Sequence, residues 1–460
     1  MSTSTIIIVL LLLSVVGYYL GRRTSVRTAG GDMRQLHSLP SYYGYYVAIW
    51  CGLPALLLLL AWIALEPAII RSLLIAELGD AAEGLSPQQL SLMITDVQNL
   101  ALGTVTSREV DPAMRAATDY FIWLRSVSKW ALAAVALALA IAGLTYALRR
   151  IQPRLRARND VERVVIWALV ISSIIAILTT IGIVFSLVFE SARFFTKVSP
   201  IDFLFGLEWS PQIALRPGQV GGTGLFGAVP LFVGTLLIAF IAMCVAMPVG
   251  LMAAVYMAEY ADSRVRAVVK PLLEILAGIP TVVYGFFAAL TVAPFVRDLG
   301  GSLGLQISSE SALAAGVVMG VMIIPFVSSI SDDVITAVPR AMREGSYGLG
   351  ATQAETIRRV ILPAALPGIV GGFLLAVSRA IGETMIVVMA AGLSANLTAN
   401  PLEAVTTVTV QIATLLVGDQ EFDSPKTLAA FALGLVLFCV TLVLNIIALR
   451  IVTKYREQYE

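Results

Sequence analysis

Long runs of apolar residues, separated by shorter polar segments, dominate the chain. About 20 consecutive apolar residues are enough for a helix to cross a bilayer. The pattern therefore predicts nine membrane spans, at residues 4–20, 44–65, 129–148, 164–189, 228–257, 271–296, 312–330, 366–393 and 429–453. Because a spanning segment must satisfy its own backbone hydrogen bonds, we predict an all-α polytopic membrane protein.

Composition supports a membrane location. Apolar residues make up 58% of the chain and charged residues 13%, and the mean hydropathy is +0.87. Soluble domains average about 45–50% apolar and about 25% charged residues. The net charge of +1 gives no electrostatic reason to expect nucleic acid as a partner. The expected surroundings are a lipid bilayer.

Lysine and arginine are spread unevenly over the polar segments. Six arginines lie within 149–163, four more lie within a loop at 333–363, and Lys454 and Arg456 lie in the tail. Segments with few basic residues are 191–227, 297–311 and 394–428. Because basic loops stay in the cytoplasm, nine spans with the N-terminus outside and the C-terminus inside satisfy every segment.

The chain divides near residue 160. Residues 1–150 hold two or three spans and a long loop at 66–128, which we expect on the extracytoplasmic side; in it, Ser86-Pro87 predicts the start of a small amphipathic helix. The first run is preceded by neutral MSTST rather than a basic residue, so it is expected to be a retained span and not a signal peptide. Residues 160–455 hold the other six spans.

Several kinds of chemistry are excluded by what the sequence lacks. The chain has one histidine, His37, and its three cysteines all lie in apolar runs, so a His/Cys metal site is not expected. It contains no GxxxxGK[ST] motif for binding ATP. We therefore expect no enzyme activity, no catalytic residue, no metal and no cofactor in this chain.

The loop at 333–363 predicts two short helices. Pro339 can start the first, and Gly345, Gly348 and Gly350 can end it. Thr352 with Glu355 forms a capping box for the second helix, and Pro363 is expected to close the turn before the next span. A helical loop of this kind predicts a docking surface.

This loop resembles the EAA loop of binding-protein-dependent ABC import permeases. In that family, a glutamate and two small residues precede a glycine and an I-x-L-P sequence; here the spacing is kept by Glu344, Gly345, Ser346, Gly350, Val360, Leu362 and Pro363. The resemblance implies that the loop, including Arg343, inserts into a separate ATPase subunit that holds ATP and magnesium. It also implies two ATPase subunits, a second permease, an extracytoplasmic binding protein, alternating access and a bacterial cytoplasmic membrane.

Two charges lie inside the eighth predicted span. A charge at mid-bilayer costs at least about 2.5–3.5 kcal/mol, so Arg379 and Glu383 need a reason to be there. Their i, i+4 spacing predicts an ion pair, and Gly368 and Gly372 on nearly the same stripe permit close helix approach. We therefore expect the pair to point into a subunit interface or a pore and not into lipid. The functional reading is a site on the path of an anion, because arginine binds phosphate well; the other reading is a buried pair that only fixes packing.

The stretch SRAIGETMIVV around these charges, and residues 259–287, resemble the phosphate-permease branch (PstC type) of the same family. The resemblance covers about residues 160–455 and implies a six-span permease core in which Arg379 and Glu383 contribute to phosphate passage. Alternatives are a permease for sulfate or molybdate, whose members carry GEFGA here, and an ion-driven secondary transporter with Arg379 and Glu383 as a relay. A membrane enzyme or sensor lacks support in the sequence.

Two further residues are candidates for gating. Glu274 follows Lys270 by four residues near the start of the sixth span, which predicts an interfacial pair or a switch contact. Pro280, after Gly278, interrupts the same span. A broken helix can mark a transport site, although a proline kink is also common in membrane helices.

Overall fold

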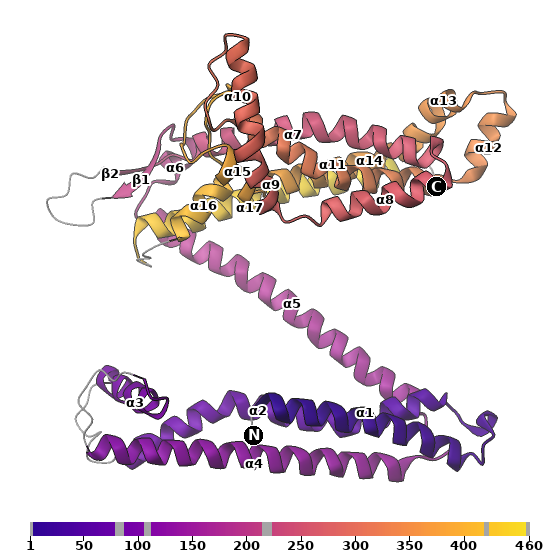
Figure 1. Cartoon of the computed structure of the whole chain (residues 1–460), viewed down its shortest axis with the longest axis vertical. Coiled ribbons are helices and arrows are strands. Elements are labelled where there is room, and N and C mark those ends of the chain that lie inside the picture. The colour runs from indigo at the N-terminus through magenta and orange to yellow at the C-terminus, as the bar shows by residue number, and fades with distance from the viewer. Residues whose placement is uncertain (1–2, 79–86, 105–111, 214–222, 418–422, 457–460) are drawn as a thin grey trace. The chain divides into compact units, whose positions relative to one another are not determined.

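The computed structural model describes residues 3–78, 87–104, 112–213, 223–417 and 423–456, and most of them are helical (Figure 1). Within these residues, nine helices are long and apolar enough to cross a membrane. The prediction of a polytopic all-α membrane protein with nine spans is confirmed on these criteria. The chain forms two compact units, Met1–Leu178 and Thr179–Glu460. Each is described on its own below.

Three long helices form the first unit: α1 (Thr3–Thr28), α2 (Pro40–Leu78) and α4 (Pro112–Arg150). They are accompanied by the short η1 (Met33–Gln35), by α3 (Pro87–Ala101) and by the first half of α5 (Ala157–Phe195). Small residues allow the helices to approach closely. A Cβ added at Gly143 on α4 would lie 2.0 Å from the backbone oxygen of Trp50 on α2. On α1, a Cβ added at Gly21 would lie 2.7 Å from the backbone oxygen of Tyr43 on α2, so the first predicted span is also a packed helix.

Residues 66–128 are more helical than predicted. α2 continues to Leu78, α3 begins at Pro87, and α4 begins at Pro112. The three helices share a small core that contains Leu74, Val97 and Phe121. An amphipathic helix after Pro87 is confirmed, whereas its expected cap, Ser86, lies outside the described residues. The expected domain boundary near 160 also differs, since the division falls inside α5, which is one continuous helix.

The second unit begins with the second half of α5 and contains five further spans. One end of its bundle carries a short helix and an antiparallel hairpin, α6 (Pro200–Phe205), β1 (Trp209–Ile213) and β2 (Thr223–Phe226), in which Trp209 pairs with Phe226. The spans and their connections are α7 (Val229–Val255), η3 (Tyr256–Tyr260), α8 (Ser263–Ala277), α9 (Thr281–Phe287), η4 (Ala288–Val292), α10 (Ala293–Ser302), α11 (Ala312–Ala337), α12 (Arg340–Gly348), α13 (Gln353–Thr356), η5 (Ile357–Ile361), α14 (Leu362–Ile381), α15 (Met385–Ala390), α16 (Val408–Leu416) and α17 (Pro425–Arg456).

Helices α7 and α11 form the centre of the second unit. Their interface is made of alanines, glycines and methionines such as Ala242, Ala246 and Met319, all buried. A Cβ added at Gly320 would lie 2.8 Å from the backbone oxygen of Ala242, so the two backbones are nearly in contact. Without a hydrophobic difference between helix and lipid, such close packing is what holds membrane helices together.

Two predicted spans have different limits in the structure. Residues 271–296 do not form one span: α8 ends at Ala277, Pro280 caps α9, and the spanning helix runs over Thr281–Ser302. Residues 366–393 are also interrupted, because α14 ends at Ile381 and α15 starts at Met385. Both breaks follow a glycine at the helix C-terminus, as expected from its poor helix propensity.

Close α7–α11 packing predicts a position-specific response to one added methyl group. Gly320→Ala should destabilise the chain by about 1–3 kcal/mol, because the methyl meets backbone of α7 and overpacks the interface. Gly182→Ala on α5 is the control: its Cβ meets nothing within 4 Å, so the change should be neutral or slightly stabilising. Thermal unfolding in detergent measures both, and equal midpoints for the two variants would contradict the packing described.

Candidate functional site

The 333–363 loop folds into two helices, as predicted. α12 runs from Arg340 through Gly345 to Gly348, so Gly345 lies inside the helix and does not end it. The chain reverses at Gly350, whose φ of +87° suits glycine. The capping box of Thr352 and Glu355 is present at the start of α13, and the Ser346 and Thr356 hydroxyls lie 2.9 Å apart across the turn.

Arg343 ties this loop to the spans. Its guanidinium donates hydrogen bonds to Glu259 Oε1 at 2.9 and 3.2 Å, and the two side chains are only 17% and 7% exposed. The same guanidinium donates to the backbone oxygens of Ile335 and Val338, at 2.7 and 2.5 Å. Those two carbonyls belong to the end of α11, where a helix runs out of intrahelical donors; the Ile335 oxygen accepts in addition from the backbone N–H of Val338 at 3.3 Å. One side chain therefore links α12, α11 and η3.

Glu259 was not singled out as a site residue by sequence reasoning. It lies in η3, at the end of the span formed by α7, and its backbone oxygen accepts a second hydrogen bond from Gln353 Nε2 at 2.6 Å. Behind these contacts, Ile335, Ile357 and Ile361 are buried in one apolar cluster. Both helices of the loop are thus fixed to the spans by polar contacts over an apolar base.

The remaining residues of the loop differ in how exposed they are. Glu344 and Pro363 are exposed, Leu362 is half-buried, and Leu349 at the turn is 91% exposed. Pro363 does not close a turn, contrary to the prediction, because α13, η5 and α14 form one continuous helical span over Gln353–Ile381. The π-helical turn of η5 ends at Ile361, two residues before Pro363. Pro363 lies at position N1 or N2 of α14, where its missing N–H is tolerated.

A second ionic cluster joins α8 to α11. The Asp332 carboxylate is 0% exposed and lies 2.9 Å from both Arg266 Nη2 and Lys270 Nζ. Lys270 also bonds Asp333 at 2.8 Å, and these two carboxylates, Asp333 first, raise the pKa of Lys270 above its ordinary value. A buried carboxylate needs such partners, so the cluster fixes α8 against the end of α11.

The expected pair between Lys270 and Glu274 is wrong. Lys270 is used by the two aspartates of α11, and Glu274 is exposed with no ion pair within the part of the chain that the structure describes. Pro280 does interrupt the helix as predicted: Gly278 ends α8 and Pro280 caps α9. Gating by Glu274 or Pro280 remains a prediction.

The expected ion pair between Arg379 and Glu383 is also wrong. Arg379 lies in the last turn of α14, whereas Glu383 lies in the break before α15. There the Glu383 carboxylate accepts hydrogen bonds from the backbone N–H groups of Met385 and Ile386, at 3.0 and 3.4 Å, and so caps α15. The helix that would have brought the two charges together ends between them.

Arg379 keeps its charge available for another partner. Its guanidinium lies over the ring of Phe326, 5.6 Å from the centroid, and the side chain is exposed on this single chain. Over the described residues it forms no ion pair. An arginine at this depth is expected to face a protein or aqueous surface rather than lipid. It can receive an anion there.

Gly368 and Gly372 permit close helix approach, as expected, and the neighbour is α11. Their added Cβ atoms would meet Val334 and Ile330 of α11, at 2.5 and 2.7 Å. The glycine stripe therefore packs α14 against α11 within this chain, and the expectation that the two charges point into a subunit interface or a pore remains a prediction. Asn445 of α17 accepts from the Ser378 hydroxyl at 3.2 Å and supports the same helix from another side.

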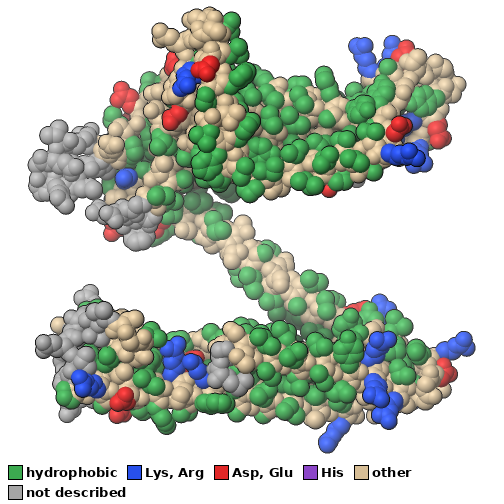
Figure 2. All heavy atoms as spheres, viewed as in Figure 1, with side chains coloured by type: hydrophobic (Ala, Val, Ile, Leu, Met, Phe, Trp, Pro, Cys, Tyr) green, Lys and Arg blue, Asp and Glu red, His purple; other side chains and the backbone are tan. Residues whose placement is uncertain are grey.

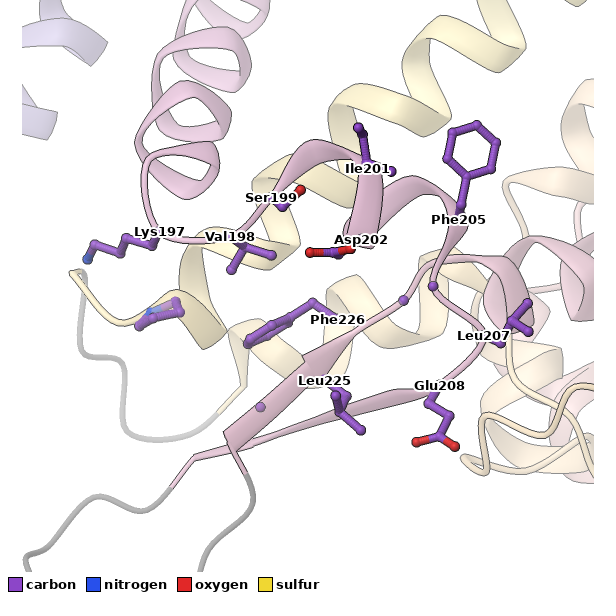
Figure 3. A pocket seen from close by; sticks show the side chains of 14 residues that line it. Lys197, Val198, Ser199, Ile201, Asp202, Phe205, Leu207, Glu208, Leu225 and Phe226 are labelled. Atoms are coloured by element: carbon purple, nitrogen blue, oxygen red, sulfur yellow. The ribbon is translucent and has the colours of Figure 1, made fainter.

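The opposite end of the bundle carries a cavity of about 860 Å³, which the sequence did not indicate (Figure 3). Figure 3 shows Phe205 and Asp202 of α6 together with Leu225 and Phe226 of β2 along its wall. On β1, the Trp209 indole donates to Gln411 Oε1 at 3.0 Å, which joins the hairpin to α16. The lining mixes charged and apolar side chains.

Comparison with known proteins identifies two regions. Residues 246–457 match the family described as "Binding-protein-dependent transport system inner membrane component". Residues 7–179 match a separate family described as "Phosphate ATP-binding cassette transporter". The first match contains the loop, both ionic clusters and Arg379, and the second covers nearly all of the first unit.

Two relatives by sequence are named as permease proteins. The chain is 34% identical over 260 residues to "Probable ABC transporter permease protein YqgH" of Bacillus subtilis, covering 56% of this chain and 80% of that one. It is 34% identical over 281 residues to "Phosphate transport system permease protein PstC 1" of Mycobacterium tuberculosis, covering 55% and 81%. A bacterial alginate ABC transporter structure overlaps partially, with 16% identity, a TM-score of 0.45 and coverage of 66% and 99%.

The chain is therefore a multi-pass membrane permease subunit of an ABC importer. It belongs to the binding-protein-dependent ABC import permease family, and several of its relatives are named as phosphate permeases.

The Arg343–Glu259 pair should contribute measurably to stability. Arg343→Gln and Glu259→Gln should each cost about 1.5–3 kcal/mol, because each leaves a largely buried charged group without its partner. The double variant should cost less than the sum of the two single ones. Arg340→Gln, on the exposed face of the same helix, is the control and should change little. Additive costs in a thermal-unfolding cycle would show that the two side chains do not interact.

Proposed function

We propose that this chain is the permease subunit of an ATP-driven importer for inorganic phosphate. The observation that carries the proposal is the position of Arg379. Its guanidinium lies in the permease core, just before the break between α14 and α15, and has no carboxylate partner in the described structure. A planar guanidinium matches phosphate oxygens through two parallel hydrogen bonds. The names of the relatives favour the same substrate.

In this proposal Glu383 supports the structure around Arg379, whereas the sequence predicted that it contributes to phosphate passage. Its carboxylate caps α15, and its backbone oxygen accepts from the Thr409 hydroxyl at 2.9 Å. It thus holds the break between α14 and α15 in place beside Arg379. An anion that binds Arg379 avoids competition from a paired carboxylate, while the single guanidinium keeps binding weak enough for release, as conduction requires.

Energy for transport comes from a partner in this proposal. Two ATPase subunits dock on the cytoplasmic side, one of them on the loop with Leu349 at its tip, and they hold ATP and magnesium. A second permease subunit completes the pore, and an extracytoplasmic binding protein delivers phosphate at the end that carries the hairpin. Nine spans in the bacterial inner membrane, with the N-terminus outside, place the arginine-rich 149–163 and 333–363 segments in the cytoplasm.

Two alternative functions predict different properties of the transporter. A sulfate or molybdate permease would use the same fold and the same Arg379, and would differ in which oxyanion competes. An ion-driven secondary transporter needs Arg379 and Glu383 as a proton or ion relay and works without an ATPase. The separation of those two side chains, with Glu383 used as a helix cap, weighs against a relay.

Uptake by the reconstituted complex tests the proposal. ATP-dependent uptake of labelled phosphate should resist a tenfold excess of sulfate or molybdate, and Arg379→Gln should lower it by about tenfold or more, because removal of a charge-assisted contact to phosphate costs roughly 1.5–3 kcal/mol. Arg379→Lys should retain part of the activity, since it keeps the charge but not the planar fork.

Assembly must be measured in the same preparations. Arg297→Gln on α10 is the control, because it removes one exposed arginine next to Asp298 and should leave uptake intact. Normal phosphate uptake by Arg379→Gln would show that Arg379 has only a packing role. Uptake of sulfate or molybdate in place of phosphate by the wild type would change the substrate and leave the permease class standing.

A further inference from the structure

A pocket in the first unit has the layout of an amphiphile-binding site. It has a volume of about 420 Å³ and lies between α2, the end of α4 and the start of α5. Its charged lining residues are Arg150, Asp160 and Arg163, and its apolar ones include Leu53 and Val164. No function of the transport core described above requires this pocket.

The charged and apolar parts of the lining are separated along the helices. Arg150 is the last residue of α4, and Asp160 and Arg163 lie in the first two turns of α5. Leu53 lies 13 residues after Pro40, the first residue of α2, and therefore about 20 Å along that helix. The pocket thus has a charged rim at the helix ends and an apolar wall that continues into the span.

Aromatic side chains mark the depth of the rim. The Trp50 ring lies 5.1 Å from that of Tyr146 and 6.4 Å from that of Tyr46. The Arg150 guanidinium lies over Tyr146, 5.6 Å from the ring centroid. Tyrosine and tryptophan gather where membrane helices meet the headgroup layer, so the rim lies at headgroup level.

The rim has a net charge of +1, and the segment around it is strongly positive. Residues 149–163 contain six arginines against two carboxylates, Asp160 and Glu162. Glu162 is already paired with Arg158 at 2.5 Å, and Asp160 is only loosely paired with Arg163, at 3.7 Å. Arg150 forms no ion pair with any described residue, and its side chain interacts with the Tyr46 hydroxyl in the same lining. Neither Arg150 nor Arg163 has a close carboxylate partner, so both can contact an added anion.

The frame around the pocket is fixed by hydrogen bonds. The Tyr43 hydroxyl of α2 reaches the backbone oxygens of Pro153 and Leu155, at 3.2 and 3.1 Å, in the connection between α4 and α5. The Ser38 hydroxyl accepts from the backbone N–H of Arg158 at 3.2 Å. The start of α5 is thereby held against the start of α2, and the rim keeps its geometry without a ligand.

We propose that this pocket binds one anionic glycerophospholipid, with its phosphodiester between Arg150 and Arg163 and an acyl chain along Leu53 and Val164. The ligand chemistry at the rim is a phosphate, which a lipid or free phosphate could supply; the apolar wall selects the lipid. Asp160 at the rim adds to this selection, because it repels a phosphate dianion more than a singly charged phosphodiester. The site anchors the first unit to its surrounding bilayer and is independent of the transport function proposed above.

Native mass spectrometry of the full-length chain with phosphatidylglycerol tests the proposal. One retained lipid per chain is expected for the wild type, and Arg150→Gln and Arg163→Gln should each weaken retention about fivefold, the usual effect of one basic residue near an anionic lipid. Arg154→Gln is the matched control: it makes the same charge change in the same segment, but Arg154 does not line the pocket. Arg163 is 71% exposed, so its replacement should not affect folding.

Three outcomes would overturn the proposal. Equal loss of lipid in Arg154→Gln and Arg150→Gln would indicate a diffuse basic surface without a site. Displacement of the lipid by millimolar inorganic phosphate would assign the pocket to the free anion. Equal retention of phosphatidylcholine would show that the arginines do not select the headgroup.

Discussion

The ion pair between Arg343 and Glu259 joins the 333–363 loop to the membrane spans, and much of the architecture at that end of the bundle depends on it. Arg343 satisfies a nearly buried carboxylate and also two carbonyls at the end of α11. Either group alone would be costly to bury without a partner. Both costs are avoided only while α12 lies against η3 and α11, so the position of the loop follows from the need to satisfy these groups.

The Asp332 cluster extends the same principle to α8. Asp332 is fully buried and is neutralised by two cations of α8, while Arg343 holds the final turn of the same α11 helix. Helix α11 is therefore held by polar contacts from α8 and from α12. Along its length it also packs closely against α7 and α14, where glycines allow the backbones to approach. In the proposed transport cycle, a displacement of the loop passes to α7, α8 and α11 together. α14 continues from the loop to Arg379, 17 residues beyond Leu362 and about 26 Å along the helix.

Sequence reasoning succeeded where local physics decides the structure. Apolar run length located nine spans, and the Thr352–Glu355 capping box was recognised because its partners are three residues apart. It failed where a distant residue competes with a near one. Lys270 has Glu274 one turn away but pairs with Asp332, 62 residues later. The reason is that leaving a buried carboxylate without a partner costs more free energy than leaving an exposed one unpaired.

The candidate site shows the same division. Arg379 and Glu383 were found from the cost of charges in a membrane span, but their pairing assumed a continuous helix. Gly382 ends α14 instead, and Glu383 gains two backbone donors as the cap of α15. The helical content of 66–128 was underestimated because α2 and α4 continue past their apolar runs as helices that pack on α3. Glu259 could be recognised only through its contact with Arg343.

We infer that the loop moves with α7 as one body, because Arg343 ties it to η3 and α11. We would measure the distance between spin labels at Leu349, at the tip of the loop, and at Met252, an exposed residue of α7, in the complete complex with the native cysteines Cys51, Cys244 and Cys439 replaced. We expect one narrow distance distribution that is the same without nucleotide and with ATP trapped, and a broad distribution in Arg343→Gln. A shift of several ångströms between the two nucleotide states in the otherwise native chain would contradict it, since the loop would then move independently of the span to which Arg343 ties it.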